Sequence, residues 1–229
     1  MEPDELQAIA SAIAHELRNP VAAIRALAQT GLRMYEGLAD DARREFFRLI
    51  DEEARRLAEV ADQAATALKV QAGSLAYDVA EHRLAEVVRE SAQAAAIGDH
   101  PLAVEADEDV VARIDRARIG EVVAQLVGNA AKFSPAGAAI VVRARRDDGR
   151  AVIEVEDRGP GIPKSRREDV FDRFTSVRPP GYEDVPGAGL GLHICRAHVE
   201  ALGGTIDVAE PSGASSAGTM LRVELPAEE

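Results

Sequence analysis

The chain has 229 residues, 46% hydrophobic and 29% charged, which is ordinary for a soluble globular protein of one large or two small domains. Its formal charge of −13 argues against broad electrostatic binding of nucleic acid or of an anionic membrane. No apolar run approaches the roughly 18 residues that span a bilayer, and the N-terminus lacks the features of a signal peptide. The single cysteine, Cys195, fits a reducing compartment, so we expect a cytoplasmic protein.

The first third of the chain predicts two long helices. Apolar residues recur there at three- and four-residue intervals, first from Leu6 to Leu27 and then from Phe46 to Leu68, with a turn near Gly37. Each helix is expected to have about 30 residues and a length of roughly 45 Å. A lone hairpin cannot cover both apolar stripes, so we expect two chains to form a four-helix bundle, and hence a homodimer, through residues 1–70. The alternative is a hairpin that docks on its own C-terminal domain.

Beyond a short linker at residues 72–75, the pattern changes to alternating strands and helices. We expect strands over 76–79, 103–106, 110–114, 139–146, 152–156, 205–208 and 219–225, and helices over 84–96, 116–133 and 190–201. Consecutive strands with turn residues between them predict three hairpins, 103–114, 139–156 and 205–225. The fold class is therefore two domains: an all-α hairpin over 1–71, and an α/β sandwich over 76–229 with a mixed sheet and helices on one face.

The hexapeptide His15-Glu16-Leu17-Arg18-Asn19-Pro20 combines groups that suit phosphoryl chemistry. His15 is a titratable nucleophile, and Glu16 is a carboxylate that can accept a proton. Asn19 lies one helical turn further on the same face, and Pro20 frees a backbone carbonyl and predicts a bend. An exposed histidine on a helix is usually inert, so this segment gains meaning only if the chain also holds a phosphate donor.

Two glycine-rich segments are candidates for holding that donor. Asp157-Arg158-Gly159-Pro160-Gly161 follows an expected strand, where a carboxylate can accept from an exocyclic amine and glycines allow close approach of a ring or phosphate. Gly187-Ala188-Gly189-Leu190-Gly191 opens an expected helix, whose free N–H groups suit phosphate. It lacks the trailing Lys-Ser/Thr of a Walker A loop, and it lies too late in the chain for a Rossmann fingerprint. Each segment alone is also compatible with a simple turn or with close packing.

Asn129 lies inside the expected helix 116–133, where asparagine is unfavourable unless its amide has a partner. Its oxygen is a donor of the kind that Mg²⁺ prefers. Lys132, three residues later on the same face, can neutralise a phosphate. A capped or solvent-facing asparagine is the alternative interpretation.

Taken together, these segments resemble the sensor histidine kinases of bacterial two-component systems. The hexapeptide at His15 is similar to the phosphoacceptor box and residues 125–133 to the N box. Residues 157–161 and 187–191 are similar to the two glycine boxes, and 170–174 to the F box. Order and spacing agree from about residue 8 to 225. The resemblance implies a dimerisation and histidine-phosphotransfer domain followed by a Bergerat-type ATP-binding domain.

The resemblance also implies roles for individual residues. Asp157 would bind the adenine amine of ATP, Asn129 would ligate Mg²⁺, and Lys132 and Phe133 would line the nucleotide pocket. Further nucleotide contacts would come from Gly159, Gly161, Arg173, Gly187, Gly189, Leu190 and Gly191. Residues 175–186 would form a mobile lid anchored by Phe171 and Phe174. The family commonly has Asn where this chain has Gln125, which puts direct metal ligation by that residue in doubt.

In the implied reaction, His15 attacks the γ-phosphorus of ATP, Glu16 accepts the imidazole proton, and the phosphoryl group passes to an aspartate of a cognate response regulator. Asn19 is a candidate for orienting water in a phosphatase reaction on that regulator. An ATPase of the same fold without phosphotransfer, or a scaffold that only binds nucleotide, are the alternatives. The input signal would come from a separate sensor protein or from a sensor domain missing from this sequence.

Overall fold

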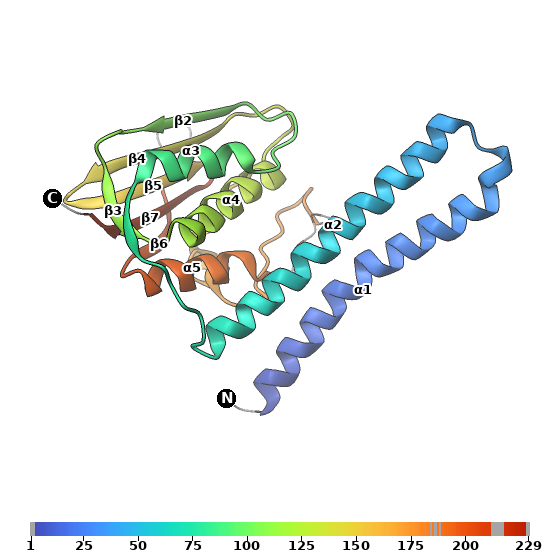
Figure 1. The fold of residues 1–229 in the computed structure, drawn as a ribbon, viewed down its shortest axis with the longest axis horizontal. Coiled ribbons are helices and arrows are strands. Elements are labelled where there is room, and N and C mark those ends of the chain that lie inside the picture. The colour runs from blue at the N-terminus through green and yellow to red at the C-terminus, as the bar shows by residue number, and fades with distance from the viewer. Residues whose placement is uncertain (1–2, 184, 186, 188, 212–217, 228–229) are drawn as a thin grey trace. The chain divides into compact units, whose positions relative to one another are not determined.

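The computed structural model describes residues 3–183, 185, 187, 189–211 and 218–227. The chain divides into two compact units, Met1–Gln71 and Ala72–Glu229, and each is described by itself (Figure 1).

The first unit is a helical hairpin. Helix α1 (Pro3–Met34) and helix α2 (Asp40–Gln71) have 32 residues each and are joined by the short 3₁₀ helix η1 (Tyr35–Gly37), which confirms the two predicted helices. Arg43 closes the turn, because its guanidinium donates to the Tyr35 carbonyl at 3.1 and 2.9 Å and lies 4.5 Å from the Tyr35 ring centroid. Pro20 lies inside α1 and removes one backbone hydrogen bond from it.

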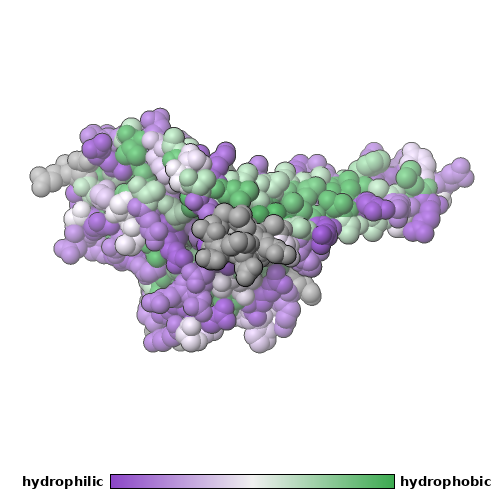
Figure 2. Space-filling view, turned by 90° about the horizontal axis from the view of Figure 1, so that it is seen from below, coloured by the Kyte–Doolittle hydropathy of each residue, from purple (hydrophilic) through white to green (hydrophobic). Residues whose placement is uncertain are grey.

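The hairpin leaves large apolar side chains in solvent. Leu32 and Phe47 are 76% and 68% exposed, and Met34 and Tyr35 are also exposed. Figure 2 shows apolar residues running along the hairpin. Within the described residues, none of the helices is both long and apolar enough to cross a bilayer.

The second unit is built on a mixed sheet. Its strands are β2 (Leu102–Ala106), β4 (Ile140–Asp147), β5 (Arg150–Glu156), β7 (Met220–Pro226) and β6 (Thr205–Ala209), in the spatial order β2-β4-β5-β7-β6. Strand β2 runs parallel to β4, and the other pairs are antiparallel. The predicted hairpins β4–β5 and β6–β7 are confirmed. The turn between β4 and β5 has positive φ at Asp148 and Gly149, as type I′ hairpin turns require.

Helices α3 (Leu84–Ala94), α4 (Arg116–Phe133) and α5 (Gly191–Ala201) lie together against one face of this sheet (Figure 1). Two short 3₁₀ helices, η2 (Lys164–Arg166) and η3 (Asp169–Phe171), interrupt the loop before α5. Helices and sheet share one apolar core. Its fully buried members include Leu84, Val88, Ile114, Ile119, Leu126, Ile140, Ile153, Val223 and Leu225.

The face of the sheet opposite the helices carries a network of ion pairs. Ile153 and Val155 of β5 belong to the core, so Glu154 and Glu156, which alternate with them, point to the other face. Glu154 accepts from Arg145 at 2.8 Å and from Arg222 at 2.9 Å. The arginines therefore cover carboxylates that are 4% and 2% exposed.

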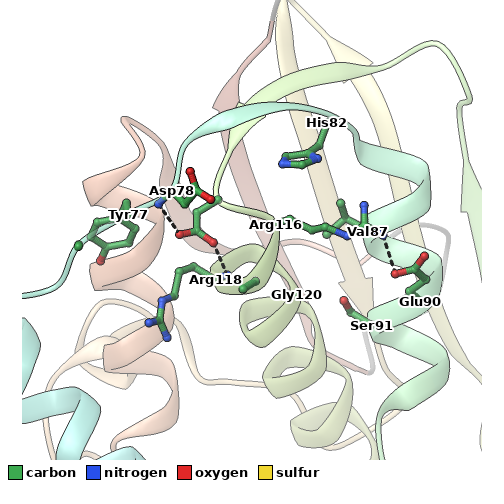
Figure 3. A pocket seen from close by; sticks show the side chains of 12 residues that line it. Tyr77, Asp78, His82, Val87, Glu90, Ser91, Arg116, Arg118 and Gly120 are labelled. Atoms are coloured by element: carbon green, nitrogen blue, oxygen red, sulfur yellow. Dashed lines mark hydrogen bonds and ion pairs between the residues drawn. The ribbon is translucent and has the colours of Figure 1, made fainter.

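Two predictions about strands were wrong. Residues 76–79 are not a strand; the strand is β1 (Ala80–Arg83). Tyr77 bonds to His198 of α5, and the Asp78 amide bonds to Asp115, the residue that caps α4, instead of to a neighbouring strand (Figure 3). The predicted hairpin 103–114 does not form either. Strand β3 (Val111–Ile114) pairs with β1 in a separate two-stranded sheet, while β2 pairs with β4. The Val110 carbonyl accepts from the Leu84 amide, which directs the chain away from β2.

Candidate functional site

The candidate phosphoacceptor residues lie on α1 in the first unit. His15 and Asn19 are exposed and four residues apart, so they share one side of the helix. Glu16 is half-buried beside them. An exposed imidazole on a long helix is open to attack a donor that approaches from solvent.

The candidate nucleotide residues belong to the second unit, and Asp157 is fixed most firmly among them. It follows β5 and is 6% exposed. Its Oδ1 accepts from the Gly159 amide at 2.7 Å and from the Thr219 amide at 3.1 Å. Burial raises the pKa of this carboxyl, while hydrogen bonds from Gly159 and Thr219 oppose that rise. The two amides hold Oδ1 in place, and a carboxylate has a second oxygen that can also accept a hydrogen bond.

Glycines let three backbone segments meet at Asp157. A Cβ on Gly159 would lie 2.5 Å from the Phe133 carbonyl oxygen at the end of α4. A Cβ on Gly218, where φ is +127°, would lie 2.2 Å from the Asp157 carbonyl oxygen. Gly161, at φ +79°, approaches the Gly218 carbonyl. No larger residue fits at Gly159 or Gly218 without moving the backbone.

Gly218 and Thr219 are functional candidates that the sequence reasoning missed. The sequence pattern places only Thr219, as the first residue of the expected strand 219–225, because its partner Asp157 is more than sixty positions away along the chain. In the sequence, only a Gly-Thr pair at the start of a strand could have indicated their role, and such a pair is not specific to a binding site.

Helix α4 supplies three more predicted residues. Asn129 is half-buried and its Oδ1 accepts from Gln125 Nε2 at 3.0 Å. Lys132 is exposed, and the Phe133 ring lies 5.9 Å from the Tyr182 ring, centroid to centroid. The Gln125 side chain therefore donates to the Asn129 side chain one turn further along α4.

The Asn129 side chain can provide one protein ligand for Mg²⁺. Asn129 Oδ1 has two lone pairs, and Gln125 occupies only one of them. Mg²⁺ commonly takes one or two protein oxygens and completes its shell with water and phosphate oxygens. Among the described residues, no group of three or more His, Cys, Asp or Glu side chains is arranged to hold a metal.

The start of α5 meets α4 and the beginning of the predicted lid. A Cβ on Gly191 would lie 2.6 Å from Gln125 Cδ, and one on Gly189, at φ +66°, would lie 2.7 Å from the Thr175 carbonyl oxygen. The Phe174 amide donates to the Gly189 carbonyl at 2.9 Å. Leu190 between the glycines is fully buried. The helix N-terminus, with its free N–H groups, is thus placed beside the amide pair of α4.

The predicted lid, 175–186, folds around Arg178, although residues 184 and 186, like Ala188 of the glycine segment, lie outside the described residues. The Arg178 guanidinium donates to Ser176 Oγ at 3.2 Å, to the Glu183 carbonyl at 3.3 Å and to the Gly187 carbonyl at 3.5 Å. Before the lid, Phe171 is buried and Arg173 is half-buried.

Comparison with protein families agrees with this architecture of a phosphoacceptor hairpin and a nucleotide-binding sandwich. The His Kinase A (phospho-acceptor) domain matches residues 5–69. The histidine kinase-, DNA gyrase B-, and HSP90-like ATPase matches residues 114–229. The chain belongs to the histidine kinases, which confirms the predicted family and fold class.

Individual relatives give the same picture. Sensor protein KdpD of Clostridium acetobutylicum is 30% identical over 219 residues, which are 94% of this chain and 24% of that protein. KdpD of Mycobacterium tuberculosis is 29% identical over 99% of this chain and 26% of its own length. The chain therefore spans about a quarter of the length of these relatives.

Among solved structures, the mycobacterial sensor histidine kinase MprB is 31% identical with a TM-score of 0.57, over 65% of this chain and 97% of that one. The Acinetobacter baumannii histidine kinase AdeS shares the fold over 94% of this chain and 98% of its own, with a TM-score of 0.69 and 22% identity.

Proposed function

We propose that this histidine kinase transfers the γ-phosphoryl group of ATP to His15 and then to an aspartate of a response regulator. The observation that carries the proposal is the presence, on one chain, of a phosphoacceptor hairpin and of a buried carboxylate, Asp157, fixed by two backbone amides. A solved complex of the histidine kinase ThkA with the response regulator protein TrrA, similar to this chain in fold, makes such a regulator a natural partner.

Each part of the nucleotide would meet a different element. The adenine amine would donate to Asp157, and the ring would lie over Gly159 and Gly161 near Phe133. The phosphates would meet Lys132, Arg173 and the start of α5 at Gly187, Gly189, Leu190 and Gly191, where the helix dipole favours anions. Asn129 would hold Mg²⁺, which when bound offsets charge on the phosphate oxygens.

Phosphoryl transfer depends mainly on positioning and electrostatics. The His15 nitrogen remote from the backbone attacks the γ-phosphorus, a P–N bond forms, and the bond to the ADP oxygen breaks. The other ring nitrogen gives its proton to Glu16, so the phosphorylated ring does not carry an extra positive charge. Lys132 stabilises the negative charge that remains on the ADP oxygens. Because ATP is available in the cytoplasm, these domains would work on the cytoplasmic side.

We also propose that the hairpins of two chains form a homodimeric four-helix bundle. The exposed Leu32 and Phe47 side chains would be covered there, and burying such side chains contributes about 1.5–3 kcal/mol each. Light scattering that finds only monomer at micromolar concentration would rule the dimer out. Because the chain spans a quarter of its KdpD relatives, the signal would arrive through a further sensor domain or a separate sensor protein.

The test is the chemical stability of the phosphate. Wild-type chain incubated with labelled ATP and Mg²⁺ should acquire an acid-labile, base-stable phosphate, and His15→Gln should acquire none while it still binds ATP. ATP hydrolysis without such a phosphate would identify an ATPase that lacks phosphotransfer. Nucleotide binding without either reaction would identify a scaffold. Both outcomes would overturn the proposal.

A further inference from the structure

The predicted lid touches helix α4 with an aromatic side chain. The Tyr182 ring lies 5.9 Å from the Phe133 ring, centroid to centroid, and the two ring planes are tilted by 39°. Tyr182 is half-buried, whereas its neighbours Gly181 and Glu183 are exposed. The Tyr182 side chain therefore packs against the last residue of α4, while the loop around it faces solvent.

This contact is made beside Asp157. The Phe133 carbonyl oxygen lies so close to Gly159 that a Cβ on that glycine would be 2.5 Å from it. The Gly159 amide in turn donates to Asp157 Oδ1 at 2.7 Å. Tyr182 thus meets α4 at the residue that lies against the proposed adenine site.

A tight turn presents the Tyr182 side chain. The Tyr182 amide donates to the Pro179 carbonyl at 3.0 Å, which closes a four-residue turn over 179–182. Pro180 occupies the second position and Gly181, at φ +87°, the third, a pattern typical of a type II turn. A Cβ on Gly181 would meet nothing within 4 Å. This glycine is therefore needed for its backbone angle and not for space.

Hydrogen bonds within the lid hold the turn in place. The Arg178 guanidinium bonds Ser176 before the turn and the carbonyls of Glu183 and Gly187 after it. The Glu183 carboxylate accepts from the Gly181 amide at 2.9 Å. These partners all belong to the loop or its end, so the loop can keep its shape when it moves as a unit.

The base of the lid is fixed by other hydrogen bonds. Phe174, the residue before the lid, has φ +59°, a conformation that is unfavourable for a residue with a side chain and persists only where neighbours enforce it. Its amide donates to the Gly189 carbonyl at 2.9 Å, and the Thr175 amide donates to the Asp172 carbonyl at 3.2 Å. Backbone hydrogen bonds thus hold the base, whereas the turn at the other end is held on Phe133 by a ring contact.

We propose that Tyr182 is a positioning residue that keeps the lid closed over the nucleotide site: its ring contact with Phe133 must break whenever nucleotide enters or leaves. Both partners belong to the protein, so the contact opposes opening in both directions. The inference rests on the part of the proposed function that places ATP beside Asp157, and not on phosphoryl transfer to His15.

The consequence concerns rates and not affinity. A pair of aromatic rings stabilises the closed lid enough to slow its opening about two- to twelvefold. Loss of the Tyr182 ring should therefore raise both the association and the dissociation rate constants by about this factor. Their ratio, the Kd, should stay within about twofold of wild type, because a contact that is the same in the free and bound states does not change affinity. A side chain that touched the nucleotide itself would change the Kd.

Stopped-flow binding of a fluorescent ATP analogue with Mg²⁺, to chains that contain both units, tests this inference. Tyr182→Ala should raise both rate constants about two- to twelvefold at an unchanged Kd. Tyr182→Phe keeps the ring and should match wild type. Tyr35→Ala is the matched control, because it removes the same side chain from the turn of the first unit, and it should also match wild type.

The turn provides an independent test. Gly181→Ala places a Cβ at a backbone angle that alanine disfavours, although the new atom touches no neighbour. This change alone should raise both rate constants, because the turn no longer presents Tyr182 correctly. In the Tyr182→Ala background it should have no further effect, since both changes act through the same contact.

Unchanged rate constants in Tyr182→Ala overturn the inference, and so does full additivity of the Gly181→Ala and Tyr182→Ala effects. A rise of the dissociation rate constant alone, with a weaker Kd, also overturns it, because Tyr182 would then contact the nucleotide directly. A wild type that binds the analogue but leaves His15 unmodified overturns the proposed phosphotransfer and leaves this inference standing. A wild type that does not bind the analogue overturns both.

Discussion

Asp157→Asn should reverse the nucleotide preference of the ATP-binding unit. The two backbone amides of Gly159 and Thr219 bind Oδ1, an acceptor that asparagine keeps. The other carboxylate oxygen, which the proposal offers to the adenine amine, becomes an NH₂ group. When ATP binds, the new NH₂ group and the adenine amine are both hydrogen-bond donors and cannot pair. ITP presents a carbonyl oxygen in place of the amine, and this oxygen can accept from the NH₂ group.

The size of the effect follows from the hydrogen bond that changes. A hydrogen bond to a charged group contributes about 1.5–3 kcal/mol, so its loss weakens ATP about 10- to 150-fold. A new neutral bond to ITP contributes about 1 kcal/mol. The ratio of ATP to ITP affinity should therefore change by roughly 100-fold or more.

The Asp157→Asn substitution should lower ATP affinity without lowering the thermal stability of the protein. The folded-state pKa of Asp157 is raised above its ordinary value of 3.8, chiefly by burial. The stability that this group contributes is therefore fully present below pH 3.8 and is lost as the pH rises through the raised pKa. Asparagine does not ionise, so Asp157→Asn should unfold at the same or a higher temperature than wild type at pH 7.

The assay is isothermal titration of wild type, Asp157→Asn and the control Asp148→Asn with ATP and with ITP, together with thermal melts from pH 3.5 to 7. Asp148 is an exposed turn residue at φ +46°, so its variant makes the same charge change away from the site. Retention of ATP affinity by Asp157→Asn would refute the assignment of the adenine site. Loss of ATP affinity together with a lower melting temperature would indicate local unfolding instead.

Three further predictions concern single residues. Gly218→Ala should destabilise the chain by about 1–3 kcal/mol, because the new Cβ meets the Asp157 carbonyl and φ is +127°; an unchanged urea midpoint would contradict this. Burial raises the pKa of the Cys195 thiol to about 12, so iodoacetamide should modify it only in denaturant, and rapid labelling of native protein would show the reasoning to be wrong. Asn19→Ala should lose at least about tenfold in regulator dephosphorylation while His15 phosphorylation survives, and unchanged dephosphorylation would remove Asn19 from that role.

Local sequence patterns predicted the helices and two of the three hairpins. The apolar periodicity of α1 and α2 is long and regular, and the Asp148-Gly149 pair dictates one kind of turn. The nucleotide and phosphotransfer roles of the site residues remain predictions, although the structure brings the predicted segments of the second unit together around Asp157 and the start of α5.

What the sequence did not predict depends on partners distant along the chain. The strand Val111–Ile114 has a suitable neighbour in Leu102–Ala106, and its pattern alone does not exclude that hairpin. Other strands compete for these two as pairing partners. In the structure β2 pairs with β4, and β3 pairs with β1. Tyr77 likewise lies in the strand expected over 76–79, whereas a histidine 121 positions later holds it outside one.

The ion pairs on the open face of the sheet also bear on how the strands find their alignment. A slip of one residue would turn the core side chains of β7 outward, but a slip of two keeps the alternation of inward and outward positions intact. Charge distinguishes those alternatives. Glu154 lies opposite Arg222 in the native register, and a two-residue slip would place it opposite Glu224 or Met220 instead. The outer arginines and glutamates thus encode which of several equally amphipathic pairings is the native one.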